Sequence, residues 1–235
     1  MIQEIGDSVE KRARQIVYEV EFALLQEKND VVFEKQTEFL GCAIEELLSD
    51  LGDKVLEFAQ INQERAQLFK EQLNVTTVWT YPAITFLKLA HSRSDRKIAG
   101  LLLTGPDGNP AIIVPDGLFP HEMAGIREAA KRGVQPGEDL DKIVEVAGRL
   151  TQKRLVIHEL LHLLRGDHLG IEVGQLPLKL IEDSIEYFAL QIDRFNSTKP
   201  EILSGFEGLV GSENLAKRVL LTNDVSLLPS GFQSF

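Results

Sequence analysis

Two histidines and a glutamate interrupt a strongly apolar stretch, residues 155–164, in which seven of the ten side chains are apolar. Such a stretch predicts a helix that is buried on every side. His158 and His162 are four residues apart, so one helical face presents both imidazoles to a single ion. Glu159 points about 100° away, where a carboxylate can act on water activated by that ion. The pattern therefore predicts a divalent cation between the histidines, with Glu159 as general base.

A purely structural interpretation of these residues stays open, because buried histidines can also be satisfied by backbone carbonyls. The apolar neighbours, however, leave few partners for Glu159, and burying an ionised carboxylate without a partner costs several kcal/mol. The lone Cys42 cannot build a cysteine metal site. Any further ligand must therefore be a histidine or a carboxylate.

Two acids in the next helical stretch, residues 180–190, are the leading candidates for that ligand. Glu182 and Glu186 are four residues apart and share a helical face. The alternative is that both belong to an exposed acidic face with no specific partner.

The segment from His158 to His162 has the pattern HExxH and resembles the zincin superfamily of zinc metallopeptidases. That resemblance implies a Zn²⁺ cofactor and hydrolysis of peptide bonds in an intracellular protein substrate, with Glu159 as general base. Glu182 follows His162 by twenty residues, which resembles the gluzincins and implies His158, His162 and Glu182 as the zinc ligands. It also implies that Glu186 accepts a hydrogen bond from His158 and orients that ring.

Other features of the chain bear on this resemblance. Phe188 and Ala189 stand where gluzincins have an aromatic and a small residue, whereas Ile181 and Ile185 replace a usual asparagine and serine. Residues 155–192 are also similar to the ImmA/IrrE-like peptidases, which cut transcriptional repressors inside the cell.

His168, five residues after His162, is the alternative third ligand, as in the metzincins. In that pattern a glycine stands third after the second histidine, but here Arg165 is third and Gly166 fourth. No methionine follows the motif, although metzincins have one beneath the metal. For a group that stabilises the tetrahedral oxyanion, Tyr187 is the candidate, with His168 and Arg165 as further options.

The elements expected to position these residues define an α+β fold that is mainly helical. Residues 1–73 are expected to form an acidic N-terminal helical region, with a helix break at Gly52. Residues 74–235 are expected to form a zincin-like metallopeptidase domain with a small mixed sheet and an HExxH helix. Strand, turn and strand are predicted over residues 100–114. Because prolines bracket residues 111–114, that strand is predicted at a sheet edge, where a peptide substrate could pair with it.

Composition narrows the classes of function and location. The 235 residues carry a formal charge of −11, which does not favour nucleic-acid binding. Residues 1–75 hold 16 acidic and 8 basic side chains, so a protein partner could dock on the acidic N-terminal helices. No run of eighteen apolar residues and no signal-peptide pattern occurs, which predicts a cytoplasmic protein without a membrane segment.

A metallopeptidase, active or latent until triggered, is therefore the predicted function. The alternative is a catalytically inactive zincin-like scaffold, or a regulatory module that acts through its acidic helices.

Overall fold

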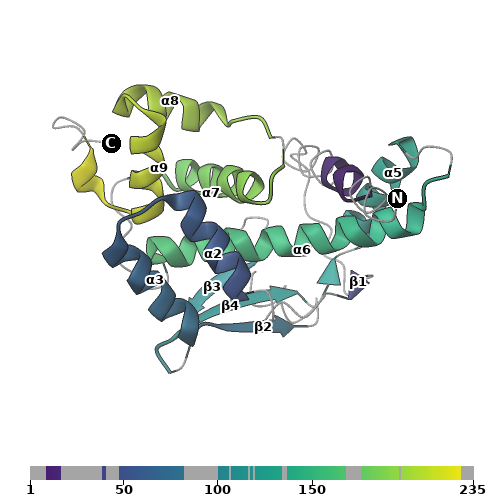
Figure 1. The fold of residues 1–235 in the computed structure, drawn as a ribbon, viewed down its shortest axis with the longest axis horizontal. Coiled ribbons are helices and arrows are strands. Elements are labelled where there is room, and N and C mark those ends of the chain that lie inside the picture. Colours follow the sequence, from purple (N-terminus) through teal and green to yellow (C-terminus); the bar gives the residue numbers. More distant parts are fainter. Residues whose placement is uncertain are drawn as a thin grey trace. The chain divides into compact units, whose positions relative to one another are not determined.

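The computed structural model describes residues 9–16, 39–40, 48–81, 100–105, 107–115, 117–118, 120–133, 137–167, 176–195 and 197–228 (Figure 1). Residues 9–16 are helical, and the named helices are α2 (Leu48–Ala59), α3 (Gln63–Val75), α5 (Pro120–Gly133), α6 (Leu140–Arg165), α7 (Leu178–Ile192), α8 (Glu201–Val210) and α9 (Glu213–Thr222), followed by the 3₁₀ helix η3 (Val225–Leu227). The strands are β1 (Phe39–Leu40), β2 (Thr77–Tyr81), β3 (Leu101–Thr104), β4 (Pro110–Pro115) and β5 (Gly117–Leu118). The predicted fold class, α+β and mainly helical with a small mixed sheet, is confirmed. None of the described helices combines the length and apolarity needed to cross a membrane.

The chain divides into two compact units. The first comprises residues 1–44, 79–101 and 113–155, and the second comprises residues 45–78, 102–112 and 156–235. This division differs from the predicted boundary after residue 73, because α2 and α3 belong to the second unit together with α7 and α9. The other predicted N-terminal helices fall largely on residues 1–8, 17–38 and 41–47, which lie outside the described residues.

The three-stranded sheet has the order β2–β4–β3. The strand–turn–strand prediction is confirmed: Gly105 N donates to the Asn109 carbonyl at 2.7 Å, and Gly108 has a φ of 82°, which glycine adopts without strain. The prediction that residues 111–114 form an edge strand is wrong, since β4 is central and buried along its whole length. Pro110 and Pro115 are the terminal residues of β4, so the strand interior keeps every backbone N–H for pairing.

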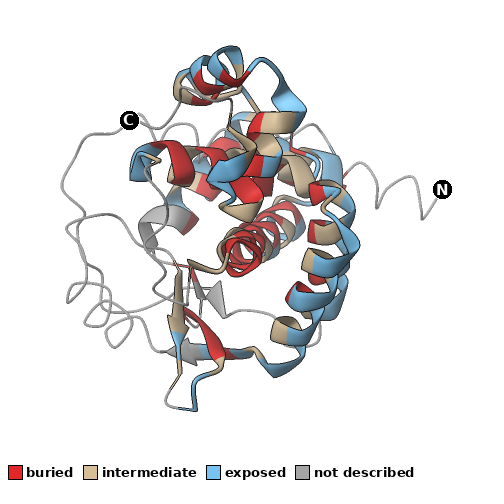
Figure 2. Ribbon diagram, turned by 90° about the vertical axis from the view of Figure 1, so that its left-hand side faces the viewer, coloured by how far each residue is buried: buried red, intermediate tan, exposed pale blue. Residues whose placement is uncertain are grey.

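Helix α6 runs without a break from Leu140 to Arg165, through Gly148. Viewed nearly along its axis in Figure 2, it is largely buried. Gly166, with a φ of 82°, ends the helix, and its N–H donates to the Leu163 carbonyl at 3.0 Å. The guanidinium of Arg65 on α3 donates to the carbonyls of Leu164 and Arg165 at 3.0 and 2.9 Å. These contacts fix the end of α6 that carries the two histidines.

In the second unit, α2 packs against α3, α7 and α9, and α8 packs against α7 and α9. Phe58 on α2 lies 5.6 Å from the ring of Phe188 on α7, and Lys217 on α9 lies 4.0 Å above the Phe58 ring. The predicted helix break at Gly52 is wrong, because Gly52 is inside α2. Its missing side chain instead makes room for Leu73 of α3.

We expect Gly52→Val to lower the free energy of unfolding by about 1–3 kcal/mol, because the added carbons would overlap Leu73. Gly205→Val in α8 is the matched control, since a Cβ there meets no atom within 4 Å. It should change stability by less than about 0.5 kcal/mol. Urea unfolding of both variants measures the difference, and equal stabilities would contradict close packing at Gly52.

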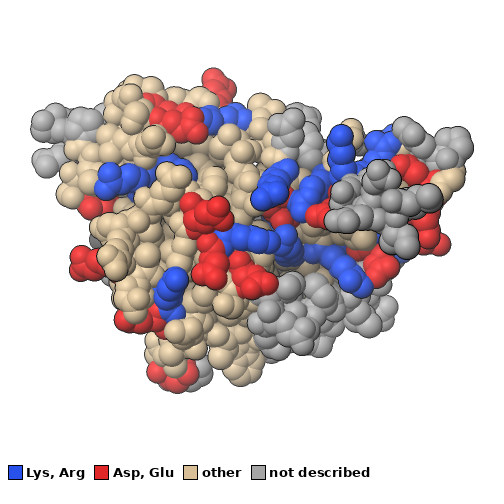
Figure 3. All heavy atoms as spheres, viewed as in Figure 1, with Lys and Arg blue, Asp and Glu red and all other residues tan. Residues whose placement is uncertain are grey.

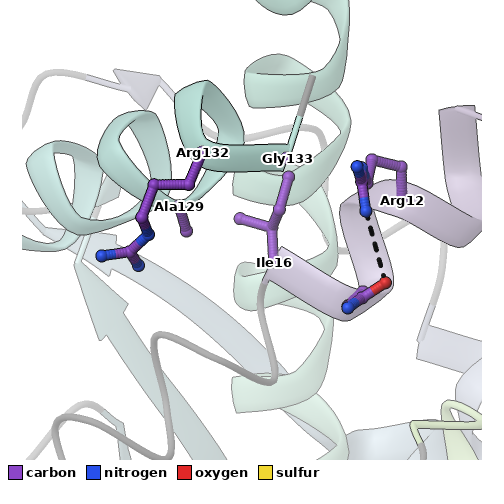
Figure 4. Close-up of a pocket in the computed structure, with 6 residues that line it drawn as sticks. Arg12, Ile16, Ala129, Arg132 and Gly133 are labelled. Atoms are coloured by element: carbon purple, nitrogen blue, oxygen red, sulfur yellow. Dashed lines mark hydrogen bonds between the residues drawn. The ribbon is translucent and has the colours of Figure 1, made fainter. Parts of the chain in front are cut away.

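In the first unit, β1 pairs antiparallel with β5, Phe39 opposite Leu118. A pocket of about 180 Å³ lies between residues 9–16 and α5 (Figure 4). Arg12 donates to Gln15 at 3.5 Å, whereas the side chain of Arg132 extends away from Arg12 (Figure 4). The two guanidinium groups therefore do not converge on a shared anion.

Charged side chains of both signs are interspersed on the face of the molecule seen in Figure 3. Several acids form ion pairs within their own helix, among them Glu10 with Arg14, Glu145 with Arg149 and Asp183 with Lys179. Such exposed local pairs contribute at most about 1 kcal/mol each.

Candidate metal centre

The three predicted metal ligands and Glu186 meet within the second unit, where one face of α6 lies against one face of α7. The two imidazoles of α6 and the two carboxylates of Glu182 and Glu186 on α7 each repeat at four-residue spacing, so each pair shares one side of its helix. His158, His162 and Glu182 form a group whose ligand atoms could hold one ion, and it is the only such group found among the described residues.

The distances between the three ligand atoms match a tetrahedral zinc site. The Nε2 atoms of His158 and His162 are 3.2 Å apart, and each lies 3.6 Å from Oε2 of Glu182. Zinc binds nitrogen and carboxylate oxygen at about 2.0–2.1 Å, so tetrahedral ligands stand about 3.3–3.4 Å from one another. The donor set of two imidazoles and one carboxylate is also typical of catalytic zinc. The residues therefore fit the ion that the sequence predicts.

The hydrogen bonds of the other ring nitrogens decide which protons the histidines carry. Nδ1 of His158 lies 3.0 Å from Oε2 of Glu186, and Nδ1 of His162 lies 2.7 Å from Oδ2 of Asp167. A carboxylate can only accept, so each Nδ1 donates its proton and a neutral ring keeps a lone pair on Nε2. Two nitrogen lone pairs and a carboxylate oxygen thus converge on one point, which requires a cation or added protons there.

The pKa values of the metal-free site also indicate that positive charge is favoured there. Burial lowers the pKa of His158, but the carboxylates of Glu182 and Glu186 outweigh burial and raise it to about 10. His162 is likewise opposed by burial, yet Asp167 and Glu182 raise its pKa. Burial raises the pKa of Glu182, whereas its contacts with both histidines hold it well below the ordinary value.

We expect the metal-free protein to lose stability as pH rises from about 6.5 toward 10. A histidine whose pKa is higher in the folded than in the unfolded state stabilises the fold fully below the unfolded value, and this contribution disappears as pH rises through the folded value, about 10 for His158. Thermal unfolding in the presence of a chelator should show a melting temperature several degrees lower at pH 9.5 than at pH 6.5. A His158→Gln variant should lose the part of this slope that comes from His158 and keep the part that comes from His162, and an equal slope in both proteins would contradict the assignment.

Glu159 lies on α6 between the two histidines, and its residue is only 5% exposed. Burial raises the pKa of its carboxyl above the ordinary value, although both histidines oppose the rise. No hydrogen-bond partner meets this carboxylate among the described residues. A buried carboxylate with a raised pKa and free oxygens has the properties of a general base.

The structure does not bring every candidate to the site. His168 lies outside the described residues. The Tyr187 ring packs against Phe188 and lies 5.8 Å below the Nζ of Lys199. Burial raises its hydroxyl pKa. No contact between Tyr187 and the histidines is found in the described part of the chain, so its role at the oxyanion stays a prediction.

Asp167 is a site residue that the sequence interpretation missed. Its contact with His162 depends on the left-handed turn at Gly166, which reverses the chain directly after α6. An acid immediately after a helix-ending glycine, five residues beyond a candidate ligand, is the signal that would have identified it. Arg165 is also placed differently from the oxyanion role considered for it: its side chain is fully buried and its Nε donates to Oδ2 of Asp167 at 3.1 Å.

Comparisons of the chain with protein-family models, with curated proteins and with solved structures gave no match, so the interpretation of the site rests on its own geometry.

Proposed function

We propose that the chain is a zinc-dependent metallopeptidase whose metal ligands are His158, His162 and Glu182. The observation that carries the proposal is the convergence of three lone-pair atoms at separations of 3.2–3.6 Å, with each imidazole oriented by its own carboxylate. Glu182 is preferred to His168 as third ligand because its carboxylate already stands beside both Nε2 atoms.

A zinc ion bound by these residues would supply a Lewis acid, which makes water nucleophilic near neutral pH and polarises a peptide carbonyl. Proton transfer is carried out by a side chain of the protein. Glu159 accepts a proton from the attacking water and delivers it to the amine that leaves when the peptide C–N bond breaks. Its raised pKa suits this exchange, since a carboxyl of ordinary pKa is a weaker proton acceptor.

Glu186 and Asp167 keep both rings in the tautomer that directs Nε2 toward Glu182. Their negative charges also make the imidazoles better electron donors to a cation. A peptide substrate that pairs with the sheet would have to use a strand other than β4, which already has a neighbour on both sides.

The test measures metal and activity on the same preparation. Purified protein should contain about one zinc per chain by elemental analysis, and it should cleave an unfolded generic protein such as reduced casein. Removing zinc with a chelator should abolish cleavage, and restoring zinc should recover it. If the protein holds no zinc after incubation with the metal, the proposal is wrong. Bound zinc without hydrolysis would instead favour a catalytically inactive zincin-like module.

A further inference from the structure

Arg165 connects the candidate metal centre to the end of another helix. Its side chain is fully buried at the C-terminal end of α6. The guanidinium donates through Nε to Asp167, through one terminal nitrogen to the Leu220 carbonyl, and through the other to Oδ1 of Asn223 at 3.4 Å. Leu220 is in the last turn of α9, whose final carbonyls have no partner within the helix. Arg165 therefore satisfies the end of α9 and an acid of the site at once.

Asp167 is the middle member of this chain of contacts. Its Oδ2 accepts from Nδ1 of His162 and from Nε of Arg165, at 2.7 and 3.1 Å. Its Oδ1 is buried and has no hydrogen-bond partner among the described residues. The Asp167 carboxylate is thus held by these two donors. If His162 or Arg165 moves, the hydrogen bond between Asp167 and the other residue changes as well.

We infer that Arg165 and Asp167 are positioning residues that couple zinc binding at His162 to the order of the last turn of α9. This inference rests on the proposed zinc site. A zinc ion on Nε2 of His162 strengthens the hydrogen bond from Nδ1 to Asp167, because the metal draws electron density from the ring. A fixed Asp167 in turn holds the guanidinium fork against the Leu220 carbonyl. Coupling of this kind is reciprocal: if zinc orders the end of α9, then an ordered end of α9 tightens zinc binding.

The first experiment compares zinc affinity in the full chain by competition with a chromophoric chelator. Asp167→Asn keeps the size of the side chain but removes its charge, and we expect zinc to bind about 10–100-fold more weakly. Asp183→Asn is the matched control, since Asp183 pairs with Lys179 on α7, and its affinity should stay within about twofold of wild type. The absorption spectrum of bound Co²⁺ should also shift in Asp167→Asn and not in the control.

The second experiment follows hydrogen exchange of amides 219–222 at saturating zinc. Zinc should slow exchange there in wild type, and Asp167→Asn should lose this added protection although it is also saturated. The third adds Arg165→Lys, which keeps the charge but cannot reach both Asp167 and Leu220. Its effect on zinc affinity should not add to that of Asp167→Asn, because both substitutions disrupt the same series of hydrogen bonds from His162 to Leu220.

Each outcome separates this inference from the proposed function. Wild-type protein that binds no zinc would overturn both. Wild-type protein that binds zinc, with Asp167→Asn within twofold of its affinity, would overturn the inference and leave the zinc site intact. Equal protection of amides 219–222 in the two saturated proteins would overturn the coupling to α9, and so would additive effects of Arg165→Lys and Asp167→Asn. If Arg165→Lys fails to fold, zinc affinity and amide protection in wild type and Asp167→Asn still test the inference.

Discussion

Glu159→Gln is expected to lower the rate of peptide hydrolysis about 10²–10⁴-fold while zinc stays bound. Glutamine has nearly the same shape as glutamate but cannot accept and return a proton at neutral pH. Glu159 supplies none of the three convergent ligand atoms, so its replacement leaves the metal site complete. The measurement is the turnover of a peptide substrate at saturating concentration, with zinc content determined on the same sample.

The matched control for this variant is Glu145→Gln, on the same helix, where the carboxylate forms an exposed pair with Arg149. This change should leave turnover unchanged. A Glu159→Gln protein that keeps its zinc and turns over within about tenfold of wild type would remove Glu159 from the role of general base. Loss of zinc in Glu159→Gln would instead show that the carboxylate contributes to metal binding.

His158→Ala is expected to weaken zinc binding by a factor on the order of 10²–10⁴. Zinc sites in proteins provide about 10–16 kcal/mol in total, and loss of one of three ligands removes roughly a quarter to a third of that. The variant also leaves Glu182 and Glu186 without the imidazole that both contact. Chelator competition measures the affinity, and circular dichroism checks that α6 and α7 still form.

A graded series makes this prediction sharper. Glu186→Gln keeps all three ligands and changes the partner of Nδ1 of His158, so its loss of zinc affinity should be about 10–100-fold, smaller than that of His158→Ala. Asp183→Asn should have no effect. If His158→Ala binds zinc as tightly as wild type, the ion is not held between α6 and α7.

The sequence predicts those parts of the site that depend on local periodicity. His158 with His162, and Glu182 with Glu186, lie at four-residue spacing within long helices, so each pair shares a face wherever the helix is placed. The resemblance to gluzincins predicted that these faces of α6 and α7 lie together, and in the structure they are in contact. The mainly helical α+β class follows from the same periodic patterns.

Features set by tertiary packing were predicted incorrectly or missed. The prolines at the two ends of β4 suggested an edge strand, but proline at a strand terminus removes no interior hydrogen bond, and β4 is central. Gly52 suggested a helix break, whereas its role is to admit Leu73 from another helix. Asp167 reaches His162 only because Gly166 turns the chain back, which no periodic pattern encodes.

The uneven exposure of the three ligands has a consequence for how metal would enter and leave. The side chains of His158 and His162 are 18% and 13% exposed, whereas that of Glu182 is 38% exposed. A chelator in solution therefore meets the carboxylate before it meets either imidazole. Exchange of the ion would begin with release of Glu182, while both rings remain clamped by Glu186 and Asp167. The rate of metal loss would then be set by release of the most exposed ligand, whereas the equilibrium affinity would depend on all three.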